Sequence, residues 1–219
     1  MTFSIIARDP ENGAVGVATA TGSIAVGAQV PHCRFGAGAV ATQGHTTNIL
    51  IARRGLPLLA EGGHAPEVLD RLLSADQGRE FRQVAMLDAK GGTAGWTGAA
   101  NSDSKGHLEG RNFIVAGNLL AGPKVLPAMR AAFESAAGTD FALRLLAALK
   151  GGEAAGGDAR GTCSAALLVD SGCGAPLDLR IDFDAAPVAA LHHLHERSQD
   201  ETYREFLRRL PSERTSSGY

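Results

Sequence analysis

The chain of 219 residues carries 21 basic and 23 acidic side chains, and 44% of its residues are hydrophobic. This length and apolar fraction are typical of one domain with a sizeable core. A net charge of −2 argues against nucleic acid as a partner, because binding to phosphates needs a basic surface. The chain lacks a signal-peptide pattern and an apolar run of roughly 20 residues, so we expect a cytoplasmic protein that does not bind membranes.

The first part of the chain is predicted to be β-structure. Residues 2–8 are rich in β-branched and aromatic side chains, and a second strand over 14–20 follows a turn that contains Pro10 and Gly13. After a short apolar run over 24–30, another strand is expected over 38–42. From about Thr46 we expect a helix that is interrupted around residues 55–57, and then a clearer helix over 65–74.

The later segments come in runs of one type. We expect strands over 84–88, 93–97 and 112–116, helices over 123–136 and 140–149, a Gly/Ala-rich loop over 151–161, strands over 163–169 and 177–183, helices over 187–195 and 199–210, and a polar tail from 211. Strands and helices that come in runs favour an α+β fold with mainly antiparallel sheets, here a four-layer α-β-β-α stack. We expect one main domain over residues 1–197, and a C-terminal amphipathic helix with its tail over 198–219.

Five stretches carry a family resemblance, and they lie at residues 2–10, 30–43, 96–98, 116–123 and 155–167. In this order and spacing the chain resembles domain-of-unknown-function family 1028, which is similar to N-terminal nucleophile (Ntn) hydrolases. The resemblance implies the αββα sandwich of that superfamily. The chain departs from the family pattern at residues 44–47 and 101–103, so we expect its substrate choice to differ.

Thr2 is the nucleophile that this resemblance implies. In Ntn hydrolases the first residue of the mature chain attacks the substrate, and its own α-amine, with a pKa near 8, acts as the base. A small residue at position 2 permits removal of the initiator Met, which would leave Thr2 at the N-terminus. The alternative is that Thr2 is only a β-branched residue at the start of a strand.

Three further residues are expected to lie near Thr2. Arg34 follows 32 positions later, where the proteasome-type branch of the superfamily places a lysine, and it could supply charge but no proton transfer. Gln43 and Asn118 are candidate donors to a developing oxyanion, because amide N–H groups stabilise such charge. For Arg34 the alternative is a surface residue at a strand end, and for the two amides it is turn chemistry.

Asp158, Arg160 and His45 are candidate substrate-binding residues. Asp158 and Arg160 lie in the Gly/Ala-rich loop and could hold the charged ends of a substrate, although an internal Asp–Arg pair is equally consistent with the sequence. His192, His193 and His195 have spacing that permits metal ligation, but they are better explained as a solvated helix face. We therefore expect no metal and no cofactor.

Two functions stay open at this point. The first is an amidohydrolase that acts on a small-molecule or peptide-like amide through Thr2. The second is a non-catalytic protein that uses the same cleft to bind a ligand or a partner, and it is favoured because residues 17–20 lack the carboxylate that the proteasome-type branch carries there. In both cases we expect a homo-oligomer.

Overall fold

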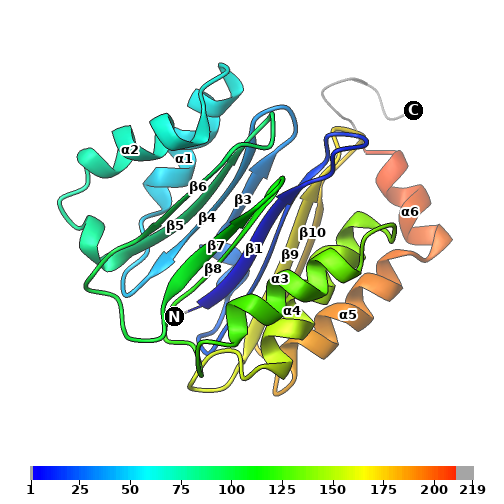
Figure 1. The fold of residues 1–219 in the computed structure, drawn as a ribbon. Helices are drawn as coiled ribbons and strands as arrows, with labels where there is room; N and C mark the ends of the chain where they lie inside the picture. Colours follow the sequence, from blue (N-terminus) through cyan, green and yellow to red (C-terminus); the bar gives the residue numbers. More distant parts are fainter. Residues whose placement is uncertain (1, 211–219) are drawn as a thin grey trace.

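Two antiparallel sheets form the centre of the computed structural model, which describes residues 2–210 (Figure 1). Met1 and the predicted polar tail over 211–219 lie outside the described residues. The six-stranded sheet has the order β10 (Leu177–Ile181), β9 (Ser164–Asp170), β2 (Val15–Thr21), β1 (Thr2–Arg8), β8 (Phe113–Gly117) and β7 (Gly106–Gly110). The four-stranded sheet has the order β3 (Pro31–Arg34), β4 (Gly38–Gly44), β5 (Arg82–Asp88) and β6 (Thr93–Thr97). The prediction of an α+β fold with mainly antiparallel sheets is confirmed.

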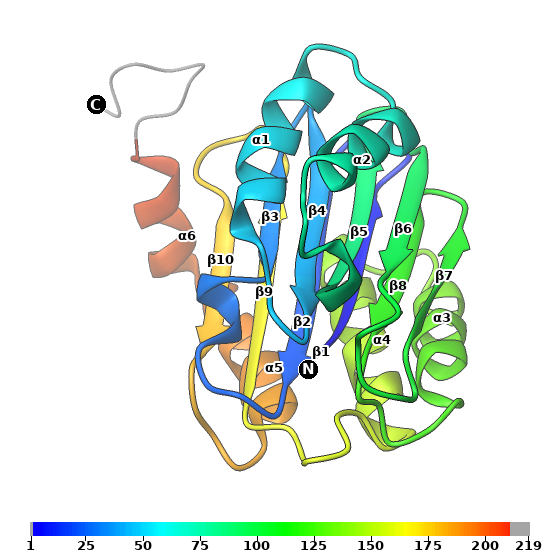
Figure 2. The same cartoon turned by 90° about the vertical axis from the view of Figure 1, so that its left-hand side faces the viewer.

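Helices lie against the outer face of each sheet (Figures 1 and 2). Helices α1 (Ile49–Ala60) and α2 (Ala65–Ser74) pack on the four-stranded sheet. Helices α3 (Val125–Ser135), α4 (Phe141–Ala154) and α5 (Pro187–Ser198) pack on the six-stranded sheet. Helix α6 (Glu201–Arg208) follows α5. The described residues also form two 3₁₀ turns, η1 (Val26–Ala28) and η2 (Arg79–Phe81).

Strand β1 has two buried faces, and its side chains alternate between them. Phe3 and Ile5 pack with the helices on one face, while Ile6 packs with the small residues that lie between the sheets. Because side chains alternate along a strand, Thr2 and Ser4 share the inter-sheet face with Ile6. The central position of β1 therefore places the hydroxyl of Thr2 at one end of the layer between the sheets.

Four elements differ from the sequence prediction. Strands β3 and β7 were not predicted, α1 continues through Pro57 without a break, and α4 runs on to Ala154, into the first residues of the predicted loop over 151–161. Pro57 lies close to the end of its helix, where the lost hydrogen bond affects only one turn. In α4, a Cβ on Gly152 would lie 2.7 Å from Met129 Cγ, so the glycine serves the close approach of α3 and not a turn.

Candidate functional site

A polar cavity of about 180 Å³ lies at the start of β1. Its wall combines the beginning of β1, the end of β2, the connection from β2 to β3 and the end of β4. The polar lining residues are Thr2, Thr21, Ser23, Gln29, Gln43, His45 and Thr47. Hydroxyl and amide groups thus dominate, and the single ionisable side chain among the described residues that line the cavity is that of His45.

Thr2 is held from two sides. Its carbonyl oxygen accepts a hydrogen bond from the backbone N–H of Asn118 (3.1 Å) and another from Gln43 Nε2 (3.3 Å). Its hydroxyl lies 3.4 Å from the hydroxyl of Thr21, its partner on β2, which is longer than an ordinary hydrogen bond between hydroxyls. The structure therefore brings Gln43 and Asn118 to Thr2, as the sequence predicted.

Arg34 does not join this group. It pairs with Gly38 at one end of β4, while Gln43 lies five residues further along the same strand. At about 3.4 Å per residue, the two ends are separated by about 17 Å. Arg34 is therefore placed at the opposite end of the four-stranded sheet, and the predicted electrostatic role next to Thr2 does not fit this position.

A chain of buried amide groups connects the two sheets behind Thr2. Ser4 Oγ donates to Gln43 Oε1 (2.6 Å), and both Gln43 Nε2 and Asn118 Nδ2 donate to Gln83 Oε1 (2.8 Å each). Gln83 Nε2 in turn donates to the carbonyl oxygens of Gly117 (2.8 Å) and Gly106 (3.0 Å). Because Gln83 Nε2 meets two carbonyl acceptors, its Oε1 must face the other amides, and all three orientations are fixed.

This network changes the role expected of Gln43 and Asn118. The NH₂ group of Gln43 bonds to Gln83 and to two backbone carbonyls, and that of Asn118 donates to Gln83, so both amides face the buried network and not a substrate in the cavity. Both residues position the start of β1 instead. Asn118 Oδ1 is buried and has no hydrogen-bond partner within residues 2–210, although buried polar atoms normally have one.

Asp158 and Arg160 form an internal pair. The buried carboxylate of Asp158 accepts hydrogen bonds from Gly22 N (2.7 Å), Arg160 N (2.9 Å), Arg160 Nε (3.0 Å) and Arg160 Nη2 (2.8 Å). Burial by itself raises the pKa of Asp158, but the donors from Arg160 and Gly22 outweigh it and hold the pKa below its usual value. With both oxygens engaged, the predicted substrate-binding role of Asp158 does not fit, and the pair fixes the end of β2 beside the cavity.

The wall next to this pair is tightly constrained. A Cβ on Gly22 would lie 2.4 Å from the carbonyl oxygen of Gly161, so a side chain does not fit there. Ser164 Oγ donates to the carbonyl oxygen of Ser23 (2.6 Å). Ala25, two residues further, has a φ of 57°, a left-handed conformation that is costly for a residue with a Cβ. The segment that faces Thr2 is therefore held in one specific backbone path.

His45 lies at the exposed rim of the cavity. Its backbone N–H donates to Asn101 Oδ1 (2.8 Å), and its ring lies 5.9 Å from the ring of Phe81. The two segments that depart from the family pattern, 44–47 and 101–103, thus meet at this rim. A role of His45 in substrate contact stays a prediction.

The sequence interpretation missed Thr21, Gln29 and Gln83. Gln83 carried a usable signal, because a polar side chain at an inward position directly before the apolar run 84–87 needs buried partners. Thr21 could have been found as the residue opposite Thr2 in the first hairpin. Gln29, by contrast, lies in the irregular segment between β2 and β3, where no periodicity indicates its direction.

Within residues 2–210, no three His, Cys, Asp or Glu side chains are grouped so that they could hold a metal ion. His193 is exposed beside Glu196, with its Nδ1 3.4 Å from the carboxylate, and His195 is buried. No helix in the same range combines the length and the apolar character needed to cross a bilayer.

Comparison with known proteins places the chain in a family and finds similar solved structures. The model of a family described as "Family of unknown function (DUF1028)" matches residues 2–191. The crystal structure of protein SPO2555 from Silicibacter pomeroyi, which carries the same family model, is 38% identical and has a TM-score of 0.92. The alignment covers 98% of this chain and 97% of that one. A comparison with curated proteins found no match.

Proposed function

Because this chain belongs to DUF1028, a family of unknown function, we propose from its site that it is an amidohydrolase with Thr2 as N-terminal nucleophile. The observation that carries the proposal is the position of Thr2. Thr2 lies at the start of a central strand and lines a polar cavity, while two donors hold its carbonyl oxygen. The two stacked sheets, with helices on both outer faces, would then correspond to the αββα sandwich of the Ntn hydrolases.

The reaction needs a base next to the Thr2 hydroxyl. Removal of Met1 would leave a free α-amine on Thr2 itself, which can take the proton of Oγ1 as that oxygen attacks the carbonyl carbon of an amide. The same amine then delivers this proton to the leaving nitrogen, and an ester on Oγ1 is formed. Water, deprotonated by the amine, hydrolyses the ester, releases a carboxylic acid and restores the hydroxyl.

Asn118 has a defined part in this scheme. Its side chain shares the inter-sheet face with Thr2 on the neighbouring strand, and its Oδ1 is a buried acceptor without a donor among the described residues. An α-amine on Thr2 would bring new N–H groups to this position. A hydrogen bond from the amine to Asn118 Oδ1 would orient the base and satisfy the acceptor.

The cavity indicates the type of substrate. Its volume of about 180 Å³ suits a small molecule, and its hydroxyl and amide lining suits an uncharged polar amide. Gln29 is exposed at the wall, so its carboxamide is available as a donor to the substrate carbonyl, the role first expected of Gln43 and Asn118. His45 at the rim would contact the part of the substrate that extends from the cavity.

Covalent labelling tests this proposal without a known substrate. Intact mass first shows whether the purified protein has lost Met1. A β-lactone probe is then added, which opens on a reactive hydroxyl to give an ester, so the protein gains the whole probe mass. We expect one equivalent of label, located on Thr2 by peptide mass spectrometry.

Three variants and one control show whether the label depends on the hydroxyl and the α-amine of Thr2. Thr2→Ala should lose the label, Thr2→Ser should keep it, and insertion of an alanine between Met1 and Thr2 should abolish it, because the hydroxyl then has no amine beside it. Thr139→Ala removes an exposed hydroxyl elsewhere on the surface and should label like the wild type. Quantitative retention of Met1, or equal labelling of Thr2→Ala, would refute the mechanism.

A ligand-binding function is the second candidate. One observation favours it. The described lining of the cavity contains neither a lysine nor a carboxylate that could make the Thr2 hydroxyl a better nucleophile. In that case Thr2 is a structural strand residue. Small neutral amides would then raise the melting temperature of the wild type and of Thr2→Ser equally, and no acid product would form.

A further inference from the structure

Ile24 adds an exposed apolar side chain to the wall of the cavity that contains Thr2. It belongs to the described lining and is 68% exposed, whereas Val26 and Val30, which also line the cavity, are buried. A single exposed isoleucine is common on protein surfaces and needs no special explanation. Ile24 differs from that ordinary case because of the way in which the backbone around it is held.

One side chain fixes the backbone on both sides of Ile24. Ser164 Oγ donates to the carbonyl oxygen of Ser23 (2.6 Å) and accepts from the backbone N–H of Val26 (3.2 Å). The two residues between these contacts are Ile24 and Ala25, and Ala25 has the left-handed conformation described above. A costly backbone conformation that neighbouring groups enforce is typical of functional sites. The fold therefore spends free energy to hold Ile24 at the cavity.

Phe183 lies on the segment next to Ile24. The backbone N–H of Ala25 donates to the carbonyl oxygen of Asp182 (2.9 Å), so Ile24 and Phe183 each follow or precede a partner of this hydrogen bond. Phe183 is 75% exposed, and these two are the most exposed large hydrophobic side chains within residues 2–210. Exposed apolar side chains that occur on neighbouring segments mark contact sites for ligands or partners. We call Ile24 and Phe183 the apolar rim.

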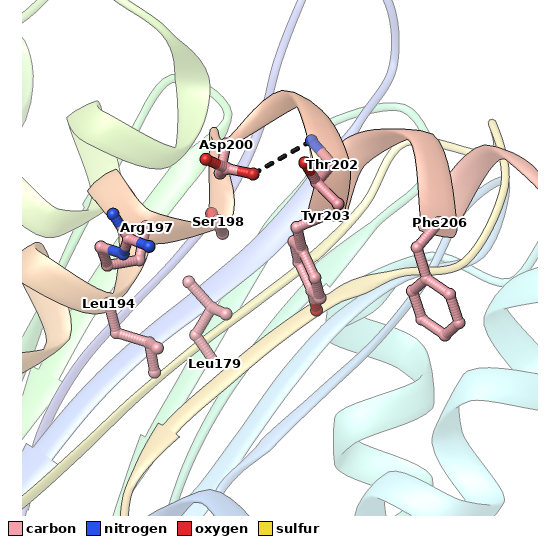
Figure 3. Close-up of a pocket in the computed structure, with 8 residues that line it drawn as sticks. All are labelled: Leu179, Leu194, Arg197, Ser198, Asp200, Thr202, Tyr203 and Phe206. Carbon is pink, nitrogen blue, oxygen red and sulfur yellow. Dashed lines mark hydrogen bonds between the residues drawn. The ribbon is translucent and has the colours of Figure 1, made fainter.

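A larger apolar groove, of about 480 Å³, lies between β10, α5 and α6 (Figure 3). Its aromatic wall consists of Tyr203 and Phe206 from α6. Helix α6 and the start of β1 lie at opposite ends of the six-stranded sheet (Figures 1 and 2). Nothing among the described residues shows what covers this groove, whereas the apolar rim borders the cavity of the proposed nucleophile.

We propose that Ile24 determines substrate specificity by contact with an apolar substituent of the substrate, which presupposes the amidohydrolase function proposed above. The substrate class is then narrowed to neutral amides that carry an alkyl or aromatic group close to the amide. The amide lies in the polar cavity with Thr2 and Gln29, and the substituent leaves the cavity over the apolar rim. The contact removes apolar surface of both molecules from water and so stabilises the complex.

Direct binding tests this contact separately from the reaction. The dissociation constants of three neutral amides are measured by NMR titration of the Thr2→Ala protein, which cannot form the ester. Propanamide is the short reference, hexanamide carries a longer chain on the acyl side, and its isomer N-butylacetamide carries the chain on the amine side. Burial of one methylene strengthens binding by up to about fourfold, so at least one of the longer amides should bind at least about tenfold more tightly than propanamide.

Substitutions of Ile24 in the same protein identify the residue responsible. Ile24→Ser should reduce the preference for the longer amide by at least about fivefold, and Ile24→Leu should keep it. Phe206→Ser is the matched control, because Phe206 is 56% exposed but lines the groove in Figure 3 and not the cavity, so the preference should persist.

The outcomes separate this contact from the reaction itself. Equal affinity for all three amides, or a preference that survives Ile24→Ser, would overturn the role of Ile24 even where the β-lactone labels Thr2. A preference that depends on Ile24 in a protein whose Thr2 is never labelled would refute the amidohydrolase and support the apolar contact as part of a ligand-binding site.

Discussion

Replacement of Gln83 by leucine perturbs the amide network that holds the start of β1. Gln83 is completely buried, and its side chain bonds to Gln43, Asn118, Thr97, Gly106 and Gly117. Leucine has a similar size but no polar atoms, so every one of these partners loses a hydrogen bond inside the protein. The substitution thus separates the loss of polar partners from the loss of volume.

The loss of stability in Gln83→Leu depends on which of its former partners find another hydrogen bond. Gln43 Nε2 keeps Thr2 O and Ala116 O as acceptors, whereas Asn118 Nδ2 has no second acceptor within the described residues. A buried polar group without a partner costs about 1–3 kcal/mol, and the two glycine carbonyls add smaller losses. We expect the free energy of unfolding to fall by about 3–5 kcal/mol, which for a chain of this size lowers the melting temperature by about 6–20 °C.

Urea denaturation followed by tryptophan fluorescence and circular dichroism measures this change. Gln77→Leu is the matched control, because Gln77 is exposed and an exposed substitution is expected to change the stability by no more than about 0.5 kcal/mol. Labelling by the β-lactone should fall with the stability, since Gln43 and Asn118 no longer hold Thr2. If Gln83→Leu were as stable as the control, the network would contribute nothing to the position of β1 and our reasoning would be wrong.

Three further predictions concern other parts of the fold. Gly22→Ala should destabilise the protein by about 1–3 kcal/mol in urea denaturation, since its Cβ would meet a backbone oxygen, whereas Gly122→Ala, with open space around the new methyl group, should not. Asp158 has a lowered pKa, so its carboxylate contributes stability that is present above its unfolded pKa of about 4 and is lost as the pH falls through the folded value. The difference in unfolding free energy between wild type and Asp158→Asn should therefore shrink below about pH 4, and a constant difference would contradict this role. Burial raises the pKa of the Cys33 thiol, so iodoacetamide at pH 8 should modify the exposed Cys173 in the folded protein and leave Cys33 intact, as peptide mass spectrometry can show.

The parts of the fold that the sequence predicted are those with two buried faces or a strong apolar period. β1 and β2 are buried along nearly their whole length, β9 contains the apolar run 165–169, and all three strands were found close to their observed bounds. The two missed strands, β3 and β7, both lie at a sheet edge. An edge strand is partly exposed and needs no clear alternation, and a proline at its first position, as in β3, is acceptable there.

The candidate site was predicted in part for a similar reason. Gln43 and Asn118 lie at the ends of buried strands next to Thr2, so motifs around them indicate their position well. Their actual bonding could not be predicted, because it depends on Gln83, which lies on a different strand. Arg34 was placed near Thr2 by its distance along the chain, but the turn between β3 and β4 directs it to the far end of the sheet.

The central position of β1 also limits the time in which Met1 could be removed during synthesis. β1 pairs with β2 directly, but its second edge is covered only by β8, which ends at Gly117. At about 5–20 residues per second, the ribosome needs about 6–23 s to add the 115 residues from Thr2 to Gly117. An aminopeptidase that removes Met1 from the nascent chain would have this interval to act before the second edge of β1 closes. A slower translation rate over the first half of the message would therefore favour complete processing.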